Sequence, residues 1–118
     1  MSKKQDDFVY IFHINDAIEK ITTYVAAHNF EDFSNNEWDQ AAITRYFEII
    51  GEASNRLSPE FKQQHPEIEW RDMNDFRNFL IHDYMDIDLK IVWSTMTKDI
   101  PPLNEKINSL LKAKKTLV

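Results

Sequence analysis

A single glycine in 118 residues is the feature that most limits what this chain can fold into. Sheet proteins reverse direction often, and glycine is the residue that tight turns favour. With one glycine and four prolines, the chain has few residues suited to such turns. The sequence therefore predicts a few long helices rather than a sheet.

Apolar residues recur at the spacing of a helix along most of the chain. Ile11, Ile14 and Ile18 begin one such stripe near the N-terminus, and similar stripes follow further on. The expected helices cover residues 6–27, 37–57, 59–64, 68–84 and 89 onward, with Pro101–Pro102 interrupting the last and residues 29–37 as a loop. The predicted fold is all-α, a single domain over 1–118: an up-and-down four-helix bundle with one extra short helix.

Several residues mark where these helices begin and what they pack against. Asn35 or Asn36, and then Ser58 and Asp88, are expected N-caps, because short polar side chains accept from exposed backbone N–H groups. Phe30 and Phe33 are expected to close the core. The second helix is expected to bury a stripe that begins Trp38, Ala42 and Tyr46, and Trp38, Trp70 and Trp93 are interpreted as core anchors.

Gly51 lies inside the second expected helix. An internal glycine costs a helix about 1 kcal/mol relative to alanine, so its presence needs a reason. The sequence predicts that another helix approaches closely at this position.

Composition excludes several classes of function. There is no cysteine, so neither a disulfide framework nor a thiolate metal site is possible. A net charge of −6 argues against broad, non-specific binding of duplex nucleic acid but leaves room for a small basic site. No signal-like or membrane-spanning apolar run is present, so a soluble cytoplasmic protein is expected. We expect no metal and no cofactor.

The stretch from Arg77 to Tyr84 concentrates the useful chemistry. On a helix with Arg77 at zero, Tyr84 falls near 340°, Asn78 near 100° and His82 near 140°, at about 100° per residue. Asn78 and His82 are four residues apart, so the amide could orient the imidazole. Guanidinium can hold a phosphate, and imidazole can take a proton from a 2′-hydroxyl near neutral pH.

Each of these residues also has an ordinary interpretation. His82 could be a surface histidine or a hydrogen-bonded core histidine, and Arg77 could form an ion pair with Asp72, Asp75 or Asp83. One helix separates Arg77 and His82 by about 7.5 Å along its axis and about 140° around it. Two copies packed across a two-fold axis could place both sets of residues around one cleft.

Arg77-x4-His82-x-Tyr84 resembles the Arg-x4-His-x-Tyr pattern of HEPN-domain toxins of the HepT type. The flanks are similar over nearly the whole chain, from Ile49-Ile50-Gly51-Glu52-Ala53 and His65-Pro66-Glu67-Ile68-Glu69-Trp70 to Asp88-Leu89-Lys90-Ile91-Val92-Trp93. The resemblance implies a small helical bundle that dimerises through the motif helix and acts as a metal-independent ribonuclease toxin. RNA is then the substrate, with tRNA as a candidate target.

The resemblance also assigns roles by position. Arg77 and His82 would be catalytic, and Asn78 would be the supporting polar residue that follows the arginine. Tyr84 would accept AMP from a cognate minimal nucleotidyltransferase antitoxin, which blocks the site. A non-catalytic binding module, or a substrate-presenting partner of a nucleotidyltransferase, is the alternative. A scaffold dimer whose motif helix serves only as an interface is a third interpretation.

Overall fold

The computed structural model describes residues 3–82 and 87–117, and the side chains within 7–82 and 87–114. Every regular element in these ranges is a helix, as the sequence predicts. The elements are α1 Lys3–Ala27, α2 Phe30–Ser34, α3 Glu37–Arg56, α4 Pro59–Gln64, α5 Trp70–His82, α6 Leu89–Ser94, the π-helix η1 Thr95–Asp99 and α7 Ile100–Leu117. No helix in these ranges is long and apolar enough to cross a bilayer.

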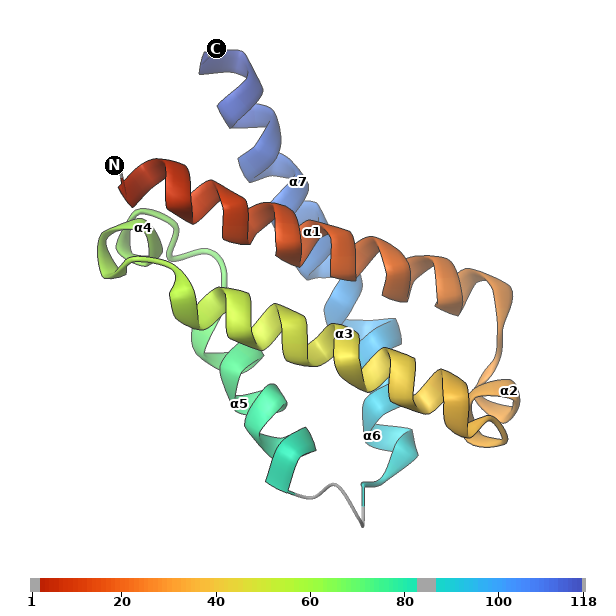
Figure 1. Ribbon diagram of the computed structural model, residues 1–118. Coiled ribbons are helices and arrows are strands. Elements are labelled where there is room, and N and C mark those ends of the chain that lie inside the picture. Colours follow the sequence, from red (N-terminus) through yellow and green to blue (C-terminus); the bar gives the residue numbers. More distant parts are fainter. Residues whose placement is uncertain (1–2, 83–86, 118) are drawn as a thin grey trace.

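The long helices run in alternating directions and form one packed body (Figure 1). α1 packs on α3, α3 packs on α5, and α7 with η1 packs on α1. In Figure 1, α6, η1 and α7 pass behind α1 and α3, and the end of α7 extends beyond α1. The all-α prediction is confirmed, and α5 lies on an outer side of the bundle, supported mainly by α3.

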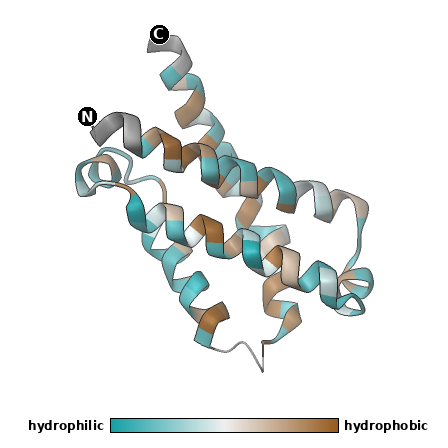
Figure 2. Ribbon diagram, viewed as in Figure 1, coloured by the Kyte–Doolittle hydropathy of each residue, from teal (hydrophilic) through white to brown (hydrophobic). Residues whose placement is uncertain are grey.

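The core is built from the apolar stripes of four long segments. Ile11, Ile14, Ile18 and Ile21 of α1 are fully buried, as their spacing predicts. Further buried side chains come from the other helices: Ile43, Phe47, Ile50, Leu80, Val92, Met96 and Ile107. Figure 2 shows α5 as mostly hydrophilic, with a hydrophobic stretch near its C-terminal end.

The expected loop at 29–37 contains a short helix, so that prediction was wrong. Asn29 caps α2: its side chain accepts from the Asp32 N–H, while the Asp32 carboxylate accepts from the Asn29 N–H. This reciprocal pair satisfies the free donors at the start of a helix. Phe33 is buried and Phe30 packs on Trp93, so both close the core as expected.

The expected stripe of α3 was wrong in its first half. Trp38 is 87 % exposed and Ala42 is exposed, while Ile43 and Phe47 face the core. Two apolar stripes at helical spacing compete along this helix, and contact with α1 and α5 selects the one that continues into Ile50. Trp70 is buried and Trp93 is half-buried, so only Trp38 fails as a core anchor.

The helix ends agree closely with the sequence. Asn36, Ser58 and Asp88 cap α3, α4 and α6 through their side-chain oxygens, and Pro59 occupies the first position of α4. The Pro101–Pro102 pair coincides with a change of helix type, since the π-helix η1 ends at Asp99 just before it. Proline has no N–H to donate, which is why a regular α-helical ladder cannot run through this point.

Buried Asp7 links the start of α1 to the start of α4. Its carboxylate accepts from the Ser58 N–H and from the Ser58 hydroxyl, both at 2.8 Å. An anion at a helix N-terminus also interacts favourably with the helix dipole. This contact holds α4, and therefore the entry to α5, against α1.

Candidate active site

Gly51 positions Arg77. A Cβ atom placed on Gly51 would lie 2.5 Å from the Arg77 Cβ and 2.7 Å from its Cδ. No side chain fits there, so α5 can approach α3 this closely only because residue 51 is glycine. The close approach expected from the sequence is confirmed, and the group that approaches is the proposed catalytic arginine.

The Arg77 side chain lies between α3 and α5, and its guanidinium has few hydrogen-bond partners among the described residues. Its Nη1 lies 3.5 Å from the Asn78 Oδ1, a long hydrogen bond. Its Nε is buried and has no hydrogen-bond partner among the described residues. Neither Asp72 nor Asp75 forms an ion pair with it within this part of the chain. A buried donor without a partner is costly, so the site is suited to an anion supplied by a ligand.

His82 occupies the last turn of α5 and is exposed. Within the described residues, no hydrogen bond joins it to Asn78, whose amide oxygen faces Arg77 instead. The expected orienting contact is therefore absent from the described part of the chain. Tyr84 and Asp83, and the expected end of the helix between His82 and Tyr84, lie outside the described residues.

The structure brings Arg77 and Asn78 together but does not place His82 beside them. On α5, about 140° of rotation separates Arg77 from His82. Arg77 is half-buried against α3, whereas His82 is exposed on the next face. A single subunit therefore presents a held guanidinium and a free imidazole on adjacent surfaces of one helix.

Two polar residues on the face of α5 that carries Asn78 and His82 were missed by the sequence analysis. Arg71 and Asn74 lie on α5, and with Asn78 and His82 they repeat at steps of three, four and four residues. At about 100° per residue, the four side chains fall within about 80° of one another. The Asn74 Oδ1 accepts from the Asn55 Nδ2 of α3 at 2.7 Å. The spacing was readable in the sequence, but only contact with α3 shows that the stripe continues.

The opposite face of α5 is apolar and acidic. A groove of about 620 Å³ lies between α5, α3 and the η1–α7 segment, with Met73, Phe76 and Phe79 on one wall. Several carboxylates line it, and a hydrogen bond that Glu69 donates to Asp72, together with the charge of Asp72, raises the pKa of Glu69. This side would repel a polyanion, which leaves the face of Asn78 and His82 for an anionic ligand.

Comparison with known proteins assigns this arrangement to a family. The family described as HepT-like (Ribonuclease HepT-like) matches residues 14–110, which include α5 and both residues of the Arg77–His82 pair. The chain belongs to the HepT-like ribonuclease family. As a member of this HEPN-type family it is a ribonuclease, and RNA is its substrate.

Individual relatives agree. A protein of Thermococcus cleftensis named "Probable ribonuclease HepT" is 43 % identical over 87 % of this chain and 94 % of its own length. A protein of Caldanaerobacter subterraneus, provisionally named an RNase, is 34 % identical over 90 % of this chain and 95 % of its own.

A Methanocaldococcus jannaschii protein named as a gamma-glutamylcyclotransferase and, provisionally, an RNase is 35 % identical over 92 % of this chain but only 49 % of its own length. No solved structure matches.

Proposed function

We propose that this HepT-like ribonuclease is the toxin of a toxin–antitoxin pair and cleaves RNA without a metal ion, with Arg77 and His82 as catalytic residues and Asn78 as support. The observation that carries this is Arg77 itself, whose aliphatic stem packs on Gly51 and whose Nε has no hydrogen-bond partner among the described residues. A guanidinium held by packing rather than by a carboxylate stays available for phosphate. That is the preorganisation that transition-state stabilisation requires.

The chemistry needs only a base and a cation. The imidazole of His82 takes the proton of the ribose 2′-hydroxyl, and the 2′-oxygen attacks the adjacent phosphorus. The bond to the 5′-oxygen breaks, leaving a 2′,3′-cyclic phosphate and a 5′-hydroxyl that takes a proton from solvent or from a second imidazole. Arg77 stabilises the extra negative charge on the pentavalent phosphate.

We infer that the working unit is a dimer joined through α5. Arg77 and His82 diverge on one helix, so a two-fold pairing is the simplest way to place guanidinium and imidazole at one phosphate. Ile81, one turn after Arg77 on α5, is 44 % exposed and supplies apolar area for such a contact.

Cleavage in the presence of a chelator tests the assignment. Purified protein should cut RNA, but not the 2′-deoxy analogue, with EDTA present. Arg77→Ala and His82→Ala should each lower kcat/KM by at least about a hundredfold, as expected for loss of charge stabilisation or of the general base. Lys98→Ala, an exposed change on η1, is the control. Full cleavage by both site variants would refute the proposal.

The antitoxin part of the proposal concerns Tyr84. The phenolic oxygen would attack the α-phosphate of ATP, forming tyrosyl-AMP and releasing pyrophosphate, with a minimal nucleotidyltransferase as catalyst. Co-expression with such an enzyme should add the mass of one or more AMP groups and abolish cleavage. Tyr84→Phe should prevent both effects. Unmodified Tyr84 in an inhibited complex would show that inhibition works by another route.

A further inference from the structure

We propose that the RNA-binding surface extends beyond the Arg77–His82 pair along the outer face of α5, through Asn78 and Asn74 to a phosphate subsite at Arg71. This inference rests on the proposed ribonuclease site and names where the rest of the substrate lies. It assigns a binding role to Arg71 and Asn74, for which no catalytic chemistry is expected.

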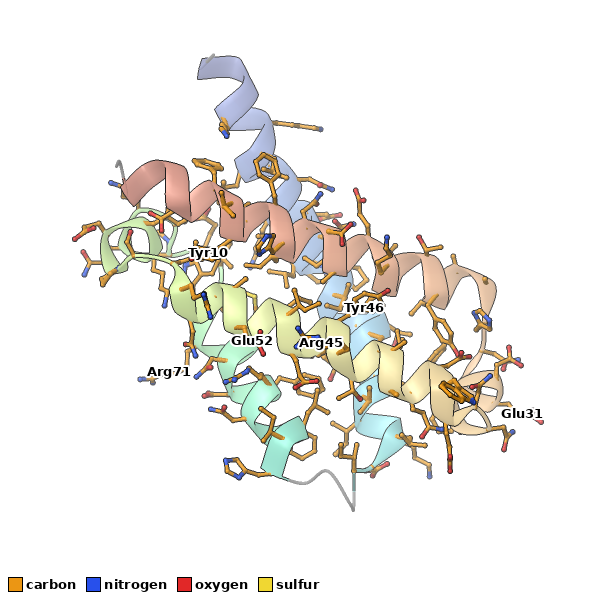
Figure 3. All side chains as sticks on the ribbon, viewed as in Figure 1. Tyr10, Glu31, Arg45, Tyr46, Glu52 and Arg71 are labelled. Carbon is orange, nitrogen blue, oxygen red and sulfur yellow. The ribbon has the colours of Figure 1, made fainter. Side chains whose placement is uncertain are left out.

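The distribution of arginine points to this face. The chain has 14 basic residues, and its four arginines all lie on α3 and α5, at positions 45, 56, 71 and 77. Arginine is the side chain suited to phosphate, because its planar fork can donate two parallel hydrogen bonds. Arg45 is engaged with Glu52 on the outer surface of α3 (Figure 3). Arg71 has no ion pair within the described residues, and Figure 3 shows it pointing outward from the start of α5.

The stripe between Arg71 and His82 is continuous. The two residues are eleven apart, about 17 Å along the axis at 1.5 Å per residue. That distance equals about five stacked nucleotides at 3.4 Å each. Asn78 and Asn74 lie between them on the same arc, and each carries an amide that can pair with a phosphate, a 2′-hydroxyl or a base edge. A strand cut beside His82 would therefore pass over Asn78 and Asn74 toward Arg71.

A hollow lies at the Arg71 end of this stripe. A space of about 590 Å³ at the start of α5 is lined by Asn55, Lys62, Arg71 and Asn74, together with Trp70 and two carboxylates. The bond between Asn55 and Asn74, at 2.7 Å, fixes both amides and leaves the Asn55 oxygen and the Asn74 N–H groups for other partners. Two cations and a locked amide pair form a site for one nucleotide.

The two carboxylates of the hollow set its limit. Glu69 and Asp72 line both this hollow and the acidic groove on the other side of α5, and a phosphate in the hollow would be repelled by Asp72. Removing that charge should strengthen RNA binding. Asp72 and Arg71 therefore provide paired variants with opposite expected effects at one site.

Binding measured without cleavage tests the subsite. In a His82→Ala background, the full chain is titrated into a fluorescein-labelled ten-nucleotide single-stranded RNA at several salt concentrations. Arg71→Gln should weaken affinity about five- to tenfold and lower the salt slope by about one, as loss of one phosphate contact does. Arg71→Lys should restore most of the salt slope. Asp72→Asn should strengthen binding about threefold.

A matched control and a second readout separate this proposal from the first. Lys98→Gln removes the same charge from η1 and should change affinity less than twofold. In the wild-type background, Arg71→Gln should raise KM for a long RNA by a larger factor than it lowers kcat.

An affinity equal to that of the control would overturn the subsite even if the enzyme cleaves RNA. Loss of affinity together with loss of the dimer would also overturn it, by showing that Arg71 holds a subunit contact. Absence of any cleavage by the wild type would instead refute the proposed function while the binding result stands.

Discussion

Gly51 and Arg77 form the contact on which the candidate site depends most directly. The glycine has no backbone conformation that requires it, since α3 is regular there. Its value lies in the missing Cβ, which lets the Arg77 stem lie flat against α3. The glycine lowers the stability of the helix by about 1 kcal/mol relative to alanine, and it allows the Arg77 side chain to be held in one place.

Gly51→Ala should lower both activity and stability. The new methyl group would meet the Arg77 Cβ at 2.5 Å, and overpacking of this kind costs about 1–3 kcal/mol, more than the gain in helix propensity. Cleavage should fall more than tenfold because Arg77 is displaced.

Urea unfolding and initial rates measure the two effects. Adding Arg77→Ala removes the contact with Cδ, so part of the stability should return. Unchanged cleavage by Gly51→Ala would mean that the position of Arg77 is not critical.

At the scale of elements, α1 and α3 are linked by Tyr24. Its hydroxyl donates to the Asp39 carboxylate at 2.7 Å, and its ring stacks on His28. Burial raises the pKa of Tyr24 well above its usual value of 10, and the hydrogen bond and the charge of Asp39 raise it further. The neutral phenol is therefore the form that the folded state prefers.

This raised pKa predicts a pH dependence with a defined sign. Tyr24 contributes its full stability below about pH 10, where the phenol is neutral in both states. Above pH 10 the unfolded state loses the proton first, so the contribution falls as pH rises. Tyr24→Phe should lower the free energy of unfolding by about 1 kcal/mol at pH 7.

Urea unfolding at pH 7, 9 and 11 checks the prediction. The difference between wild type and Tyr24→Phe should shrink between pH 9 and pH 11. A constant difference would show that the pKa is not raised.

At the scale of the whole molecule, the proposed catalytic pairing rests on the proposed dimer. One subunit presents Arg77 and His82 on adjacent faces of α5, and the acidic groove on the opposite side leaves one face for RNA. A pair of subunits joined through α5 would combine both groups at each of two equivalent sites.

Mixing inactive variants tests this directly. If each site uses Arg77 of one subunit and His82 of the other, Arg77→Ala and His82→Ala subunits should complement. Random reassociation gives one intact site in half of the dimers, so activity should recover to about a quarter of wild type. Each variant refolded alone is the control. No recovery, with mixed dimers present by native mass spectrometry, would place both residues in the same subunit.

Much of this protein follows from the sequence alone. The helical class, the caps at Ser58 and Asp88, the change of helix type before Pro101 and the need for a close approach at Gly51 are local properties. Each depends on the chemistry of one residue or on a spacing of a few residues, which the chain carries before it folds.

Tertiary structure decided the rest. Two stripes of α3 were equally helical, and only packing against α1 and α5 turned Ile43 inward and left Trp38 in solvent. Contacts between helices decided which residue meets Gly51 and paired Asn55 with Asn74. They also left Arg77 without a carboxylate partner within the described chain. Such contacts depend on which surfaces meet, and burial is set by the neighbour rather than by the residue itself.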